Sequence, residues 1–144
     1  MPIDVASLSS QAYARLQTDA LGAAVRSALG AGAESVIWAE QLKRYDHDHP
    51  MPDRPLAALR MGAVSGQAYD TRILTFTWWL YDELWAADPP HARIDALVPL
   101  VEAAYPRTSL PFVEVKTANV GQGTDDEILG LRVRPVQFAI YTRG

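Results

Sequence analysis

Cysteine is absent from this chain of 144 residues. The protein can therefore form no disulfide bond, no thiolate zinc site and no cysteine nucleophile. Basic residues are few and scattered: 13 Lys and Arg stand against 17 Asp and Glu, for a formal net charge of −4. Proteins that coat nucleic acid bind it through clustered Lys and Arg, so this distribution argues against DNA as a primary ligand.

Long apolar runs are also missing. No window approaches the roughly 20 apolar residues of a membrane span, and residues 1–7 lack the basic start and apolar run of a signal peptide. We therefore expect a soluble protein that is not exported by that route. Apolar residues make up 49% of the chain and charged residues 21%, an ordinary globular composition. At this length we expect one domain spanning residues 1–144.

The most informative segment present is residues 71–81, TRILTFTWWLY, which has the pattern of one long strand. Successive side chains of a strand point to opposite faces. One face is apolar and should belong to the core: Leu74, Phe76, Trp78 and Leu80. The other mixes threonine with aromatic residues that favour interfaces: Ile73, Thr75, Thr77, Trp79 and Tyr81. A small domain has little second core, so we expect this second face to contact another subunit.

Two segments show helical periodicity. The first runs from Ser7, a possible cap, to about residue 29, and Thr18 and Gly22 are places where it could break in two. Its apolar stripe comprises Leu8, Ala12, Leu16, Ala20, Ala24 and Ala28, with Leu21, Val25 and Leu29 beside it. The second follows Asp88, and its buried stripe comprises Ile94, Leu97, Val98, Val101 and Tyr105. Pro99 inside it leaves two short helices as an alternative.

Further strands are expected at 36–39, 56–63, 112–120 and 128–142, with a polar loop at about 43–55 and a hairpin loop at about 121–127. In the last strand the apolar alternation slips by one residue near Pro135, and a bulge there would restore it. The order of elements predicts an α+β fold with an antiparallel sheet of about four to five strands. Two helices would pack on one face of this sheet and leave the other face bare.

Candidate chemistry is sparse. Asp46, His47, Asp48, His49 and Asp53 offer metal ligands within one loop, but no helical ligand pair supports them, so a solvated loop is the preferred interpretation. Gly121 and Gly123 precede acidic residues without the lysine or helix of a phosphate-binding loop. The chain has no Gly-x-Ser-x-Gly motif. We therefore expect no enzyme, no catalytic residues, no cofactor and no bound metal.

Other residues are candidates for contact with partners. Arg132 and Arg134 in the last strand could make ion pairs between subunits, or could be edge charges that prevent aggregation. With the outer face of the aromatic strand, they complete the predicted oligomer interface. The two loops supply the predicted partner contacts: Asp46, His47, Asp48 and His49 in the first, and Gln122, Asp125, Asp126 and Glu127 in the second.

Four features together resemble the small tail-terminator, or tail-completion, proteins of long-tailed bacteriophages. They are an Ala/Leu-rich helix at 14–25 (ARLQTDALGAAV), a Pro-rich loop before the strand at 56–61 (LAALRM), the strand ending in WWLY, and a helix that leads into a C-terminal hairpin. These segments cover most of the chain, although none is a diagnostic motif. The outline also fits neck proteins of the head-to-tail joint.

The resemblance implies a structural protein of the virion, assembled in the host cytoplasm. Such a protein forms a homo-oligomer, a hexameric ring that caps the tail tube and joins it to the head-side connector, and DNA passes through it without specific binding. Two alternatives stay open. One is a head-completion or neck connector protein, and the other is a small-molecule-binding α+β domain with an apolar pocket behind Trp78 and Phe76.

Overall fold

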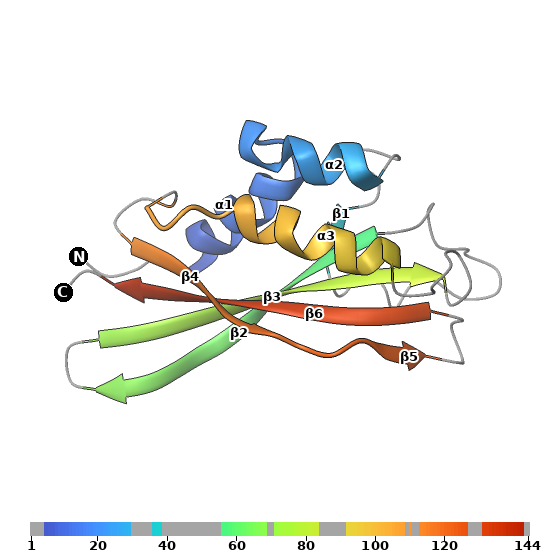
Figure 1. Ribbon diagram of the computed structural model, residues 1–144. Coiled ribbons are helices and arrows are strands. Elements are labelled where there is room, and N and C mark those ends of the chain that lie inside the picture. Colours follow the sequence, from blue (N-terminus) through green and yellow to red (C-terminus); the bar gives the residue numbers. More distant parts are fainter. Residues whose placement is uncertain are drawn as a thin grey trace.

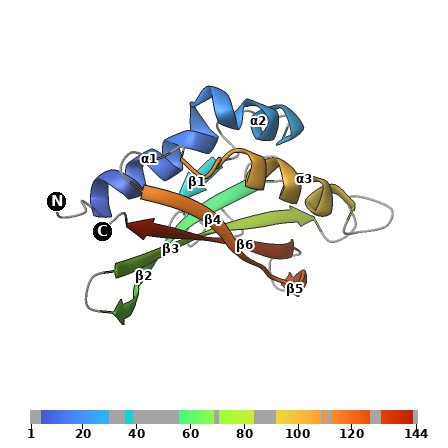
Figure 2. The same cartoon turned by 60° about the vertical axis from the view of Figure 1, so that its left-hand side comes forward.

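The computed structural model describes residues 5–29, 36–38, 56–68, 71–83, 92–108, 110, 113–126 and 131–142. Helices α1 (Val5–Gln17), α2 (Ala23–Leu29) and α3 (Ala92–Ala103) accompany a short 3₁₀ turn, η1 (Ala20–Gly22). The strands are β1 (Val36–Trp38), β2 (Leu56–Ala68), β3 (Thr71–Glu83), β4 (Val113–Val120), β5 (Thr124–Asp126) and β6 (Leu131–Thr142). Figure 1 shows the three helices together on one face of the sheet, and Figure 2 shows the same arrangement after rotation.

The strands lie in the order β1-β2-β3-β6-β4, and β5 pairs with β6 beyond the end of β4. All pairings are antiparallel except that of β1 with β2, which is parallel. The predicted α+β class is therefore confirmed, and the strand predicted at 56–63 lies in β2, which pairs antiparallel with the aromatic strand β3. The strand β5 was missed, because its three residues lie within the segment that was predicted as a loop.

The apolar face of β3 packs under the helices, as predicted. Leu74, Phe76, Trp78 and Leu80 are each at most 1% exposed. Val136, Phe138 and Ile140 of β6 lie on the same side and are equally buried. The predicted stripe of α3 is buried as well, and α3 is one helix with Pro99 inside it rather than two. Burial of these large side chains is the main source of stability.

The predicted break in the first helix is confirmed, and it changes which residues are buried. Leu8, Ala12 and Leu16 of α1 and Val25 and Leu29 of α2 are buried. Ala20, Ala24 and Ala28 are exposed, contrary to the predicted stripe, and Leu21 is 49% exposed. The reason is that η1 interrupts the helix between the two halves, so a stripe that assumes one continuous helix does not extend past it.

The predicted bulge at Pro135 is wrong. The register between β3 and β6 runs without a shift from Ile73 opposite Tyr141 to Glu83 opposite Leu131. Pro135 lacks a backbone N–H, and its carbonyl points towards β4, where it accepts from Gly121 N at 2.9 Å. None of the described strands lies beside Pro135 on this side of β6, because β4 ends at Val120 and β5 begins at Thr124. The missing N–H of the proline therefore breaks no pairing of these strands, and β6 stays regular.

Candidate interaction surface

The face of the sheet opposite the helices is the candidate site. Within the described ranges, no helix or strand covers it (Figures 1 and 2). Residues that lie directly opposite each other in an antiparallel pair share a face, so the central part of this surface follows from the register. We call it the outer face, and its central residues are Thr75, Thr77, Trp79 and Tyr81 of β3 and Val133, Pro135, Gln137 and Ala139 of β6.

None of these eight residues is charged. Thr75, Thr77, Trp79 and Tyr81 are all half-buried, while Ala139 is 3% exposed. Tyr141, at 37% exposed, is one of the most exposed large apolar residues described, and Lys116 Nζ lies 5.5 Å from its ring centroid. Tryptophan and tyrosine side chains are typical of contacts between proteins, and the charged residues that share this face by register lie on the neighbouring strands β2 and β4: Arg60, Glu114 and Lys116.

The β4 edge of the sheet is poorly suited to pairing with another strand. Val115 N already donates to Arg107 O at 2.9 Å, and Arg107 forms an ion pair with Glu114 at 3.1 Å. The register against β6 shifts between Thr117 and Asn119, which marks a bulge at the edge. Occupied donors, charged side chains and bulges all hinder addition of a strand. The outer face is therefore a better candidate contact than this edge.

Arg132 and Arg134 lie on the helix side of the sheet. The continuous register places Arg134 opposite Leu80 and Arg132 opposite Asp82. Arg134 pairs with the Asp95 carboxylate of α3 and donates from Nε to Gly121 O at 3.1 Å. These contacts are within one subunit. The prediction that the two arginines pair between subunits stays a prediction, and the observed contacts offer a different role for Arg134.

A second ion pair joins α3 to the sheet close to the first. Arg93 Nε lies 3.4 Å from Asp82 Oδ2, and Asp82 is fully buried. In the Arg93–Asp82 pair the acid is on the strand, whereas in the Arg134–Asp95 pair the acid is on the helix. Sequence reasoning missed this arrangement because the supposed bulge assigned Arg132 and Arg134 to the wrong face.

The predicted partner-contact segments are only partly described. Gln122 is exposed at the turn after β4, and Asp125 and Asp126 belong to β5, opposite Arg132 and Leu131. Glu127 lies outside the described residues. So do Asp46, His47, Asp48, His49 and Asp53, which also leaves the candidate metal loop outside. In the described ranges, no three His, Asp or Glu side chains come together as a metal site.

The helix side behind Trp78 and Phe76 is closely packed. Trp78 Nε1 donates to Tyr105 Oη at 2.7 Å, and Tyr105 Oη donates to Ala12 O at 2.5 Å. The ring centroids of Phe76 and Tyr105 are 5.2 Å apart, and those of Phe76 and Phe138 are 5.1 Å apart. Burial raises the pKa of Tyr105 far above its ordinary value. These contacts lie where the small-molecule alternative would place an apolar pocket.

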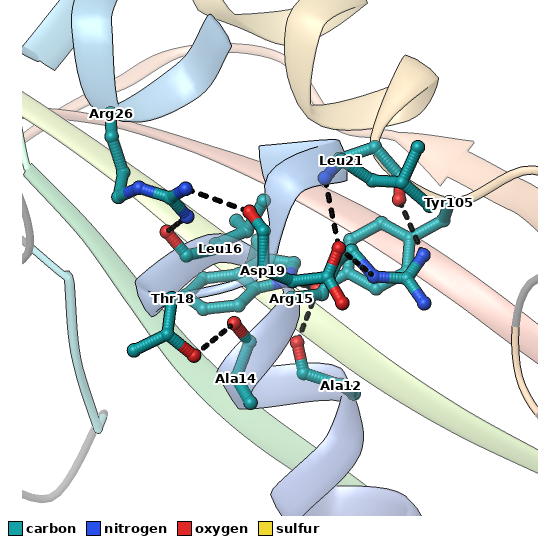
Figure 3. A network of polar contacts seen from close by, with 11 residues as sticks. Ala12, Ala14, Arg15, Leu16, Thr18, Asp19, Leu21, Arg26 and Tyr105 are labelled. Atoms are coloured by element: carbon teal, nitrogen blue, oxygen red, sulfur yellow. Dashed lines mark hydrogen bonds and ion pairs between the residues drawn. The ribbon is translucent and has the colours of Figure 1, made fainter. Parts of the chain in front are cut away.

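Figure 3 shows the polar contacts that hold the two halves of the interrupted first helix, α1 and α2, in place. Arg15 Nη1 donates to Ala104 O at 2.8 Å and so joins α1 to the residue that follows α3. Arg26 donates to Leu16 O and Asp19 O at 3.1 and 2.7 Å. Main-chain carbonyls at a helix end need such donors. The helix side therefore has the contacts of a structural core, which leaves the outer face as the candidate site.

Comparisons with known proteins give a likeness of fold. No family model matches the chain, and no curated protein matches it. Among solved structures, a chain from "Virion of native gene transfer agent (GTA) particle" is similar, with a TM-score of 0.58 and 15% sequence identity. The match covers 99% of this chain and 100% of that one. At this identity the similarity concerns the fold alone.

None of the described helices is both long and apolar enough to span a membrane.

Proposed function

We propose that this chain is a structural protein of a phage-like virion, and more specifically a tail-terminator-like ring subunit. In this role it caps the tail tube and joins it to the head-side connector, without catalysis or a cofactor. The observation that carries the proposal is the match to a virion chain across essentially the full length of both chains. A shared fold over the whole length supports a shared structural role more strongly than a match to one motif would, although fold alone does not determine function.

The outer face supports the same proposal from the physical side. Its half-buried aromatic and threonine side chains suit a contact with a neighbouring subunit, because tryptophan and tyrosine are enriched in contacts between proteins. In a ring, each copy presents this face to a different surface of the next copy, since only such a heterologous contact closes into a cyclic assembly of more than two subunits.

The remaining surfaces follow from that arrangement. The segments at about 43–55 and 121–127 would reach the tail tube or the connector, and DNA would pass through the ring without specific binding. The chain would thus be found in the virion, at the joint of tail and neck, after assembly in the host cytoplasm. A net charge of −4 favours passage of DNA, because it offers the phosphates no overall attraction.

The small-molecule alternative is disfavoured by the packing behind Trp78. Tyr13 stacks on Trp78 with ring centroids 6.2 Å apart, and Tyr105 and Phe138 fill the space beside Phe76. A neck connector protein has the same physical requirements as a terminator and differs only in the partner that it binds. Co-sedimentation with assembled tail tubes or with connector rings separates these two roles.

The first test is the native mass of the purified chain, measured by light scattering after gel filtration over a range of concentrations. One chain has a mass of 15.8 kDa. We expect a closed species of about six copies, with ring-shaped particles in negative stain, as in the family that the sequence resembles. A single-chain mass at every concentration, and again in the presence of tail tubes, would refute the ring.

A further inference from the structure

Arg134 lies where α3, β6 and the segment 121–126 meet. Its Nη1 pairs with Asp95 Oδ1 in the first turn of α3, and its Nε donates to Gly121 O at 3.1 Å. A guanidinium group carries several donors in fixed directions, so one side chain can hold a carboxylate and a carbonyl at once. The side chain of Arg134 is 26% exposed, which shields this arrangement only partly from solvent.

The corner at residues 121–123 fits closely against β6. Gly121 N donates to Pro135 O at 2.9 Å, and a Cβ added at Gly121 would lie 2.5 Å from Pro135 Cγ. A Cβ added at Gly123 would lie 3.1 Å from Arg132 Nε. Side chains of β6 therefore occupy the space beside both glycines.

The segment beyond the corner has little of its own to hold it. β5 has three residues and pairs only with β6 among the described strands. Short edge strands open at low free-energy cost. The two hydrogen bonds at the corner, from Arg134 Nε to Gly121 O and from Gly121 N to Pro135 O, therefore add to this short pairing in holding residues 121–126 against β6.

We propose that Arg134 is a positioning residue that couples the first turn of α3 to the corner 121–126. Loss of the Asp95 contact on the helix would then loosen the corner, although the change is made on another element. The importance of the corner for partner binding rests on the proposed function, which places segment 121–127 against the tail tube or connector. The coupling itself uses contacts within one subunit and does not need a ring.

Hydrogen exchange measured by mass spectrometry on the dilute chain tests the coupling. The key variant is Asp95→Asn, which removes the charge that holds Arg134 from the helix side. We expect exchange in peptides covering 121–126 to rise by up to about fivefold, because an ion pair whose side chains are 26% and 40% exposed is worth at most about 1 kcal/mol. The control is Arg107→Gln, which breaks an exposed ion pair to Glu114 at the far end of β4 and should leave 121–126 unchanged.

The outcomes are separable. Unchanged exchange at 121–126 in Asp95→Asn, or an equal rise in Arg107→Gln, would overturn the coupling. Should Asp95→Asn unfold the chain, Arg134→Lys is the second variant. Lysine keeps the positive charge but cannot donate to Asp95 and to Gly121 O in two fixed directions, so we expect faster exchange confined to 121–126. Exchange at 121–126 that stays the same in Arg134→Lys would likewise overturn it. A single-chain native mass would count against the ring and would not alter any of these results.

Discussion

At the scale of single residues, Tyr105 makes both polar and aromatic contacts within the core. Its hydroxyl accepts from Trp78 Nε1 and donates to Ala12 O, and so joins the sheet to α1. Arg15 lies over its ring, with the guanidinium carbon 5.6 Å from the centroid. The residue is 4% exposed, so water cannot replace either hydrogen bond.

Tyr105→Phe should therefore lower the free energy of unfolding by about 1–3 kcal/mol, because it leaves the buried indole N–H and the Ala12 carbonyl without this partner. Denaturant unfolding measures the change. Tyr141→Phe is the matched control, since Tyr141 is 37% exposed, and it should stay within about 0.5 kcal/mol of the wild type. Equal effects of the two variants would contradict the assigned role of Tyr105.

The raised pKa of Tyr105 also predicts a pH dependence. Folding holds the phenol in its neutral form, whereas the unfolded chain ionises near the ordinary tyrosine pKa of about 10. Above that pH the unfolded state binds fewer protons than the folded state, so stability falls as the pH rises. Unfolding followed from about pH 8 to 11 should show a shallower fall in Tyr105→Phe than in the wild type. Parallel curves would show that Tyr105 does not contribute.

At the scale of elements, the packing of η1 against α1 depends on one glycine. Gly22 is buried, and a Cβ added there would lie 2.0 Å from Arg15 O and 2.9 Å from Leu16 Cα. Both contacts are to backbone atoms, which cannot move aside without displacing α1. The sequence suggested Gly22 only as a helix breaker, and the close approach of the two segments is a further reason for glycine at this position.

Gly22→Ala should therefore destabilise the fold by about 1–3 kcal/mol or more, the usual cost of forcing atoms into a packed interior. Gly123→Ala is a suitable comparison, because its added Cβ would meet the end of the Arg132 side chain, which can turn away. Thermal unfolding of both variants gives the test. A Gly22→Ala melting temperature equal to that of Gly123→Ala would argue against close backbone contact.

At the scale of the whole molecule, the structure is one-sided: the helices cover one face of the sheet and leave the other without a described covering element (Figure 2). The same one-sidedness gives the chain two different surfaces, an outer face rich in aromatic and threonine side chains and a helical face. Two unlike surfaces are what a cyclic assembly needs.

Replacement of Trp79 by Ser together with Tyr81 by Thr should weaken assembly and leave the fold intact, because both side chains lie on the outer face and not in the core. Native mass and far-UV circular dichroism measure the two effects. Leu21→Ser is the control, since Leu21 is 49% exposed on the helical side. Loss of folding in the double variant would show that the two aromatics belong to a core. Loss of assembly in the control would show that the effect of the double variant is not specific to the outer face.

Local pattern was sufficient for a large part of this fold. The alternation in residues 71–81 identified the core face of β3, and the spacing of Ile94, Leu97 and Val101 identified the buried side of α3, because side-chain direction within one element depends only on its own period. The break near Gly22 was likewise predicted from residues that disfavour a helix.

Tertiary structure decided the features that depend on a neighbour. The uninterrupted register against β3 decided which face Arg132 and Arg134 occupy. That register was possible because β4 ends at Val120, beside Pro135. The short strand β5 likewise depends on its pairing with β6. Pairing and packing between distant segments set these outcomes, and no period within a single segment encodes them.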